Sequence, residues 1–206
     1  MALIHQHATL TPSKLELLAG WLPQQAWAGN GAGLRKLATY RFDDPAGEVG
    51  VETFLLQTSD HVLHVPLTYR GAPLEGAEAF LVGLMEHSEL GRRWVYDGVG
   101  DPVYVAAAAT AILTGGEEAE QYAEVDGQLQ AFGSTATAKG SGSAGTEVPA
   151  VGAVGVEQRG GVTVVRSGAL ELQVARVVTA EVDSPYTLVV NAPEVGAVVL
   201  AGASLG

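Results

Sequence analysis

The sequence predicts an α+β protein in which an antiparallel sheet carries helices packed on one face and is followed by a β-rich C-terminal region. Three observations support this fold class. Short β-branched and aromatic runs alternate with turn sequences such as DDPAGE (43–48) and RGAPLEG (70–76). Two segments, 12–22 and 102–114, carry helix start signals. After Gly133 the chain is rich in Val and punctuated by Gly, which indicates further strands joined by tight turns.

The N-terminal part is expected to form a strand and then a short helix. The strand covers Ala2–Thr9 and the helix covers Pro12–Leu22. Thr11 is the expected N-cap, because a hydroxyl just before a proline at the first helical position can accept a free backbone N–H. The apolar face of this helix is predicted to consist of Leu15, Leu18 and Leu22.

Consecutive strands and a second helix follow. The strands are expected at 34–42, 48–58, 61–70, 77–87 and 92–97. The helix begins after Asp101, with Pro102 at its first position, and ends before Gly115. Asp as N-cap, Pro at the first position and Gly past the end are strong boundary signals, so this is the best-defined helix in the sequence.

Composition divides the chain into three parts. Residues 1–116 are predicted to form an α+β domain, and residues 117–147 a connecting segment. Within that segment Gly133–Glu147, GSTATAKGSGSAGTE, is small, polar and of low complexity, which is typical of a flexible linker. Residues 148–206 form the β-rich region, which either extends the first sheet or stands as a separate domain.

Charge and cysteine content exclude several classes of protein. With 11 Lys and Arg residues and a net charge of −12, the chain lacks the basic surface that nucleic acids or anionic membranes require. It has no cysteine, so disulfides and Cys-based zinc sites are excluded. Its apolar runs are shorter than the roughly 20 residues of a membrane span, and no signal peptide is evident. We expect a soluble, cytoplasmic protein.

No motif for catalysis, metal binding or cofactor binding is complete. His5 and His7 share a strand face without an evident third ligand, and His61 and His64 point to opposite faces of a strand. The stretch GNGAGLRK (29–36) fits neither a dinucleotide fingerprint nor a P-loop. No nucleophile elbow is present. The sequence therefore predicts no catalytic residue, no metal site and no cofactor.

One family resemblance is specific. The stretches VPLTYRGAPL (65–74) and MEHSELGRRWVYDGVGDPVYV (85–105) resemble the N-terminal cap domain of actinobacterial maltokinases, and small stand-alone proteins that carry this domain. The resemblance covers roughly residues 1–116. It implies a curved, cystatin-like sheet that sits on the N-lobe of a kinase-like body and does not hold the catalytic machinery. Maltokinases phosphorylate maltose with ATP and supply maltose 1-phosphate to α-glucan synthesis.

The chain departs from that family beyond the cap-like part. A kinase-like phosphotransferase needs a catalytic Asp, a magnesium-binding Asp or Asn, and an N-lobe Lys. About 90 residues follow the cap-like part, too few for two kinase lobes, and their one lysine, Lys139, lies in the Gly/Ser-rich stretch. No catalytic residue of the family can therefore be transferred to this sequence.

Three hypotheses about function stay open. The first is a non-catalytic cap-like module that binds or regulates a protein or another component of maltose, trehalose or α-glucan metabolism. The second is a small-molecule binder for a sugar or sugar phosphate, or a carbohydrate-active enzyme. The third is a structural subunit that forms a homodimer through its Val-rich half. The predicted binding surface consists of Tyr69, Arg70, His87, Arg92, Arg93, Trp94 and Asp97.

Overall fold

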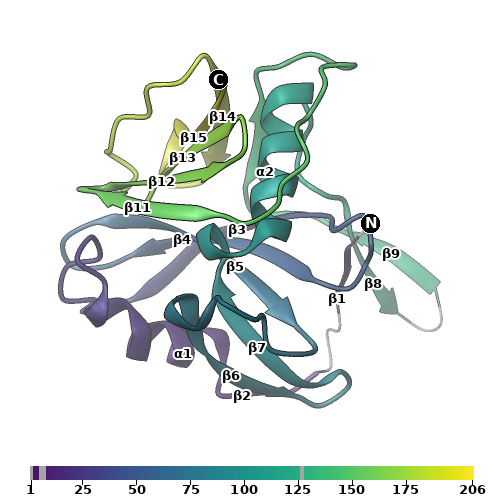
Figure 1. The fold of residues 1–206 in the computed structure, drawn as a ribbon. Helices are drawn as coiled ribbons and strands as arrows, with labels where there is room; N and C mark the ends of the chain where they lie inside the picture. The colour runs from purple at the N-terminus through teal and green to yellow at the C-terminus, as the bar shows by residue number, and fades with distance from the viewer. Residues whose placement is uncertain (1, 5–7, 126–127) are drawn as a thin grey trace.

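The computed structural model of the protein describes residues 2–4, 8–125 and 128–206. The described strands form two six-stranded sheets and one three-stranded sheet, with two α-helices (Figure 1). Strand pairing is antiparallel throughout both large sheets. The predicted α+β class with a mostly antiparallel sheet is therefore confirmed. Neither helix in this part of the chain has the length and apolar content that a membrane crossing requires.

The first sheet has the strand order β2-β6-β7-β5-β4-β3. Its strands are β2 (Leu10–Thr11), β3 (Arg35–Phe42), β4 (Gly50–Gln57), β5 (Val62–Arg70), β6 (Leu81–His87) and β7 (Gly91–Asp97). The predicted strands are all present, but the one expected from residue 77 begins at Leu81. The preceding Glu78–Phe80 forms a 3-10 turn instead.

The two α-helices pack against opposite faces of the first sheet, and not on one face as predicted. Along β4, Phe54 and Leu56 belong to the apolar cluster of α1, whereas Val51 and Leu55 belong to the cluster of α2. Because successive side chains of a strand alternate between faces, this assignment places one helix on each side. Strand β4 is therefore buried on both faces over residues 51–56.

Helix α1 (Lys14–Trp21) is capped by Ser13, so the prediction that Thr11 is the N-cap is wrong. The Ser13 hydroxyl accepts from the Glu16 N–H, and the Glu16 carboxylate accepts from the Ser13 N–H. This reciprocal pair satisfies two free backbone donors better than a single hydroxyl could. Pro12 therefore precedes the helix. The prediction that Leu15 belongs to the apolar face is also wrong, because Leu15 is 37% exposed.

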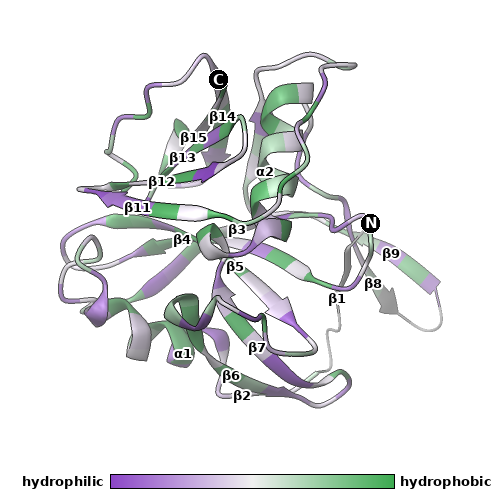
Figure 2. Cartoon of the chain, in the orientation of Figure 1, coloured by the Kyte–Doolittle hydropathy of each residue, from purple (hydrophilic) through white to green (hydrophobic). Residues whose placement is uncertain are grey.

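Helix α2 (Pro102–Thr114) begins at the N-cap Asp101 and ends before Gly115, which has a φ of 68°, as the sequence predicts. It lies between the two large sheets and is apolar over much of its surface (Figure 2). Ala108 and Ala109 are fully buried. Small side chains suit this position, because the sheets on either side approach the helix backbone closely.

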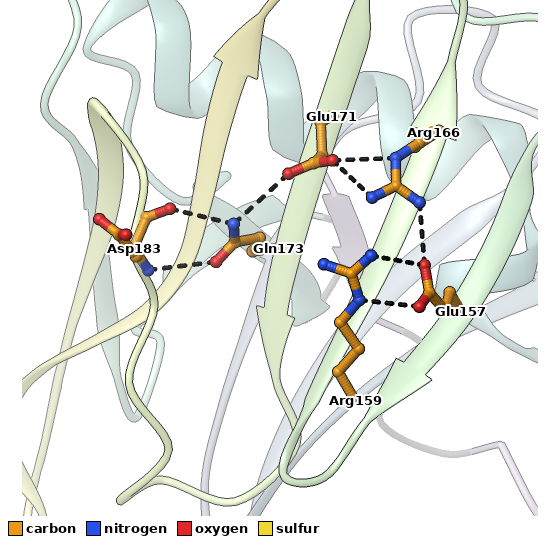
Figure 3. Close-up of polar contacts among 6 residues, drawn as sticks. All are labelled: Glu157, Arg159, Arg166, Glu171, Gln173 and Asp183. Atoms are coloured by element: carbon orange, nitrogen blue, oxygen red, sulfur yellow. Dashed lines mark hydrogen bonds and ion pairs between the residues drawn. The ribbon is translucent and has the colours of Figure 1, made fainter.

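The second large sheet has the strand order β10-β14-β15-β13-β12-β11 and does not extend the first sheet. Its strands are β10 (Thr137–Gly140), β11 (Gly155–Arg159), β12 (Val162–Ser167), β13 (Leu170–Ala175), β14 (Tyr186–Ala192) and β15 (Gly196–Leu205). Its inner face packs on α2 and shares one apolar core with the first sheet. Its outer face carries a ladder of ion pairs among Glu157, Arg159, Arg166 and Glu171, and Gln173 links this ladder to the backbone of Asp183 (Figure 3).

The smallest sheet joins β1 (Ala2–Ile4), β8 (Gln121–Val125) and β9 (Gln128–Phe132), with β1 and β8 parallel. The strand predicted over residues 2–9 is thus observed over its first three residues. Residues 5–7 lie outside the described part of the chain, and residues 8 and 9 are not in a strand.

The Gly-rich stretch 133–147 is not simply a flexible linker, because it contains β10. The Gly142 N–H donates to the Ile112 carbonyl at 2.9 Å, and the Ser143 N–H donates to the Leu113 carbonyl at 3.0 Å. These contacts satisfy carbonyls in the last turn of α2, which lack intrahelical partners. A Cβ at Gly140 would stand 1.9 Å from the Ala111 carbonyl oxygen. Glycine is needed here for close approach of two backbones.

The second sheet is anchored in the first by Arg176, which follows β13. Its backbone carbonyl accepts from the His64 N–H of β5 at 2.9 Å. Its guanidinium pairs with Asp97 at the end of β7 and lies 4.3 Å from the centre of the Trp27 ring. Arg176 is 1% exposed, so its ion pair with Asp97 is buried where the two sheets meet.

His64 is fully buried beside this junction. Its Nδ1 lies 2.8 Å from the Ala175 carbonyl oxygen, so Nδ1 carries the proton and donates to it. Its Nε2 lies 2.8 Å from the Tyr40 hydroxyl, which therefore donates to it. Burial lowers the pKa of His64 to about 4, against a weaker opposing effect of the Ala175 carbonyl. The imidazole is thus a neutral structural link between β3, β5 and the second sheet.

The substitution Gly140→Ala tests whether the Gly-rich stretch is packed. We expect it to lower the free energy of unfolding by about 1–3 kcal/mol, because the added methyl overlaps the α2 backbone. Urea denaturation followed by tryptophan fluorescence measures this. Gly133→Ala is the control, because a Cβ there has no neighbour within 4 Å. Equal unfolding midpoints for the two variants would contradict close packing at Gly140.

His64 should make folding stability depend on pH between about 6.5 and 4. Below pH 6.5 the unfolded chain takes up a proton at this site, whereas the folded chain, with Tyr40 and Arg176 facing the ring, does not until about pH 4. Stability therefore falls with decreasing pH, by up to about 1.4 kcal/mol per pH unit. As the pH falls through this range, the urea midpoint of His64→Gln should decrease less steeply than that of the parent. The control His61→Gln, at an exposed position, should follow the parent. Parallel profiles for His64→Gln and the parent would overturn this assignment.

Candidate functional site

A cavity of about 460 Å³ opens at one end of the strands of the first sheet. It lies between the start of α1, the β3–β4 turn (43–49) and the β6–β7 turn (88–90). Volumes of 300–1,000 Å³ are typical of sites for small molecules. Its polar wall includes Lys14, Arg41, Tyr69, His87 and Arg93.

Four elements, α1, β3, β4 and β5, bring together Lys14, Arg41 and Tyr69 of this wall and Glu52 behind them. Lys14 is the first residue of α1, where the helix meets the sheet. Arg41 in β3 and Glu52 in β4 are direct cross-strand partners. Tyr69 in β5 pairs with Gly50 in β4, and its ring carbon lies 3.5 Å from where a Gly50 Cβ would stand. The ring of Tyr69 therefore lies over Gly50 at van der Waals distance.

Glu52 is the centre of this group, and we call Glu52, Lys14, Arg41 and Tyr69 the Glu52 cluster. One carboxylate oxygen accepts from Lys14 Nζ at 2.5 Å and from the Tyr69 hydroxyl at 3.1 Å. The other oxygen lies 3.3 Å from the Arg41 guanidinium. Glu52 is 6% exposed, whereas the side chains of Lys14 and Arg41 are 25% and 17% exposed. The carboxylate is thus at the base of the cluster and the cations are nearer to solvent.

The ionisation states of the cluster are fixed by these contacts. Burial disfavours the Glu52 carboxylate, but the Arg41 and Lys14 charges and the two hydrogen bonds outweigh it and lower its pKa to about 2. Burial, together with the neighbouring Glu52 charge, raises the pKa of Tyr69 well above its usual value. Burial lowers the pKa of Lys14, against the opposing charge of Glu52. Near neutral pH Glu52 is therefore ionised and Tyr69 is protonated.

The opposite wall is the β3–β4 turn, which carries Asp43, Asp44 and Glu48. Asp44 is used within the turn: its carboxylate accepts from the N–H groups of Ala46, Glu48 and Val49 at 2.9–3.1 Å. Asp43 and Glu48 are exposed at the rim. The cavity thus has cations toward the sheet and carboxylates toward the turn.

Three of the seven residues predicted as a binding surface line the cavity: Tyr69, His87 and Arg93. Nδ1 of His87 accepts from the backbone N–H groups of Glu89 and Leu90, each at 3.2 Å, and so shapes the β6–β7 turn. The Arg93 guanidinium donates to the Leu90 carbonyl. Its Nε is buried and has no hydrogen-bond partner in the described part of the chain.

Two of the predicted residues are held in ion pairs away from the cavity. Arg70 makes two hydrogen bonds of 2.7 Å with the Asp101 carboxylate at the N-cap of α2. Asp97 pairs with Arg176 at the sheet junction. The charges of Arg70 and Asp97 are therefore used in ion pairs within the fold.

The last two, Arg92 and Trp94, lie on the other face of β7. Alternation along the strand separates them from Arg93, which shares the face of α1. Trp94 stands opposite Leu84 of β6, and the Arg92 guanidinium donates to Glu86 at 2.7 Å. The structure therefore divides the predicted surface between a cavity wall, two buried ion pairs and an outer sheet face.

Sequence reasoning missed Lys14, Arg41 and Glu52. One signal was available: Glu52 is the one charged residue in the strand sequence VETFLL, and a buried carboxylate needs a cationic partner. Which residues become its partners depends on strand register and on the position of α1, and neither can be read from the sequence alone. In the described part of the chain, no group of three or more acidic or histidine side chains is placed to hold a metal ion.

Residues 21–101 match the family model of the maltokinase N-terminal cap domain, which confirms the predicted resemblance for this part of the chain. The match runs from the end of α1 through β7 to the N-cap of α2. It includes the cavity residues Arg41, Tyr69, His87 and Arg93, whereas Lys14 precedes it. Among curated proteins, none matches the chain.

Replacing Glu52 by Gln tests whether the cluster holds the cavity wall. We expect a loss of about 3–5 kcal/mol of unfolding free energy, because two partly buried cations lose their counter-charge. Urea denaturation measures the loss. Glu157→Gln, in the exposed ladder of Figure 3, is the control and should unfold close to the parent. If Glu52→Gln also unfolds with the parent, the cluster does not stabilise the fold.

Proposed function

We propose that the chain is a non-catalytic, cap-like module that binds a small-molecule component of maltose, trehalose or α-glucan metabolism and serves as a binding or regulatory protein. The family match over residues 21–101 supports the link to maltokinase-type caps. The single observation that carries the proposal is the Glu52 cluster on the wall of a cavity of small-molecule size.

The cluster is suited to recognition more than to proton transfer. General acid–base catalysis is most efficient when the pKa of the group is close to the working pH. The pKa of Glu52 is about 2 and that of Tyr69 is raised, so both have moved away from neutrality, whereas burial lowers the pKa of Lys14 against the opposing charge of Glu52. Fixed charges and preorganised donors are what a binding site needs, because little reorganisation is then required when a ligand enters.

A protein partner is a second candidate, favoured by the outer face of β6 and β7. Leu84 is 44% exposed there and stands beside Trp94, with the Arg92–Glu86 pair next to them. An apolar pair with a charged border is a composition typical of protein contact surfaces. This second proposal places the partner on the face opposite α1.

Calorimetric titration with maltose, maltotriose, trehalose, glucosamine, sugar phosphates and ATP–Mg tests the first proposal. We expect at least one ligand to bind and to be recovered unchanged. Leu90→Trp, at the rim of the cavity, should abolish binding by filling the opening. Leu84→Trp is the matched control, because the two leucines are 45% and 44% exposed and Leu84 lies outside the cavity. Ligand turnover, or binding that survives Leu90→Trp, would overturn the proposal, and binding to none of these ligands would favour the protein partner.

A further inference from the structure

The charges around the cavity are arranged asymmetrically. Three of the 11 basic residues of a chain with a net charge of −12 line this one cavity: Lys14, Arg41 and Arg93. Lys14 and Arg41 share a single carboxylate, that of Glu52. The wall toward the sheet therefore carries more positive than negative charge.

Donors remain on this wall after the protein contacts are counted. An ammonium has three N–H donors and a guanidinium has five. Lys14 gives one hydrogen bond to Glu52, and Arg93 gives one to the Leu90 carbonyl, as far as the described residues show. The Nε of Arg93 is buried without a partner, which is unfavourable for a polar group. Arg93 therefore keeps N–H donors for which the described residues supply no acceptor.

Acceptors lie across the cavity. Glu48 on the β3–β4 turn is exposed at the rim. Carboxylates accept hydrogen bonds from hydroxyl groups but repel a second anion. A ligand with its charge at one end and hydroxyls at the other fits both walls, whereas a neutral sugar leaves the cations without a counter-charge.

We propose that the cavity binds a hydroxylated small molecule with one anionic group, a sugar phosphate or a sugar acid, with the anion against Arg93 and the hydroxyls toward the β3–β4 turn. This inference rests on the proposed function and specifies the ligand class. Phosphate and carboxylate share the chemistry that recognises them, since both accept two parallel hydrogen bonds from a guanidinium.

Calorimetric titration with glucose 6-phosphate, glucuronate, glucose and inorganic phosphate tests the ligand class. We expect glucose 6-phosphate, glucuronate or both to bind at least tenfold more tightly than glucose and than inorganic phosphate. Binding of glucose 6-phosphate alone identifies a phosphate site, and binding of both identifies a general anion site. Glucose binding as tightly as either anionic sugar would overturn the inference and leave the proposed function standing. If none of the four probes binds, the inference is also overturned, and the wider panel with Leu90→Trp then decides the proposed function independently.

The matched variants are Arg93→Gln and Arg92→Gln, which remove the same charge from adjacent positions of β7. Arg93→Gln should weaken binding of the anionic sugar at least tenfold, whereas Arg92→Gln should leave it unchanged, because Arg92 pairs with Glu86 on the other face. Equal affinities for the two variants would overturn the role of Arg93. Should Arg93→Gln fail to fold, the parent protein still decides, because affinity for the anionic sugar must fall as salt rises from 50 to 500 mM. Salt-independent affinity would contradict the inference.

Discussion

Helix α2 is buried between two six-stranded sheets, and this sandwich imposes the main constraint on the rest of the fold. It covers one face of the first sheet, while α1 covers the other, so the central strands have no free face. A polar side chain on those strands is costly to bury unless it finds a partner inside the protein. His64 and Glu52 are two such buried polar side chains, and they find their partners in different ways.

His64 stays neutral and links three segments through Tyr40 and the Ala175 carbonyl. Beside it, the Asp97–Arg176 pair is sealed, with side chains 7% and 1% exposed. A buried ion pair adds little net stability but disfavours arrangements in which either charge is unpaired, so we interpret this pair as fixing how the sheets meet. The Glu52 cluster lies instead near the ends of the strands, where Lys14 and Arg41 line the cavity and are partly exposed. A ligand can therefore reach the second group of charges and not the first.

The sequence predicted what depends on local signals. The strands of the first sheet and α2 with its Asp101 and Gly115 boundaries follow from residue alternation and capping preferences. Interactions that depend on register were not predictable. Arg41 and Glu52 are eleven positions apart and meet only because β3 and β4 pair as they do. The Gly-rich stretch was misinterpreted because the same composition serves a flexible linker and a close backbone contact; only the position of α2 shows which applies at Gly140.

Asp101 links the first sheet to α2, and α2 in turn packs against the second sheet, away from the cavity. It is the last residue of the family match, and its carboxylate accepts from Thr68, Arg70 and the Val103 N–H at 2.7–2.9 Å. It therefore ties β5 to the start of α2, and α2 carries the second sheet on its far side. No residue beyond Arg93 lines the cavity in the described part of the chain. The second sheet thus covers one face of the cap-like sheet, and the cavity remains open at the strand ends next to α1, where Lys14 and Arg41 are partly exposed.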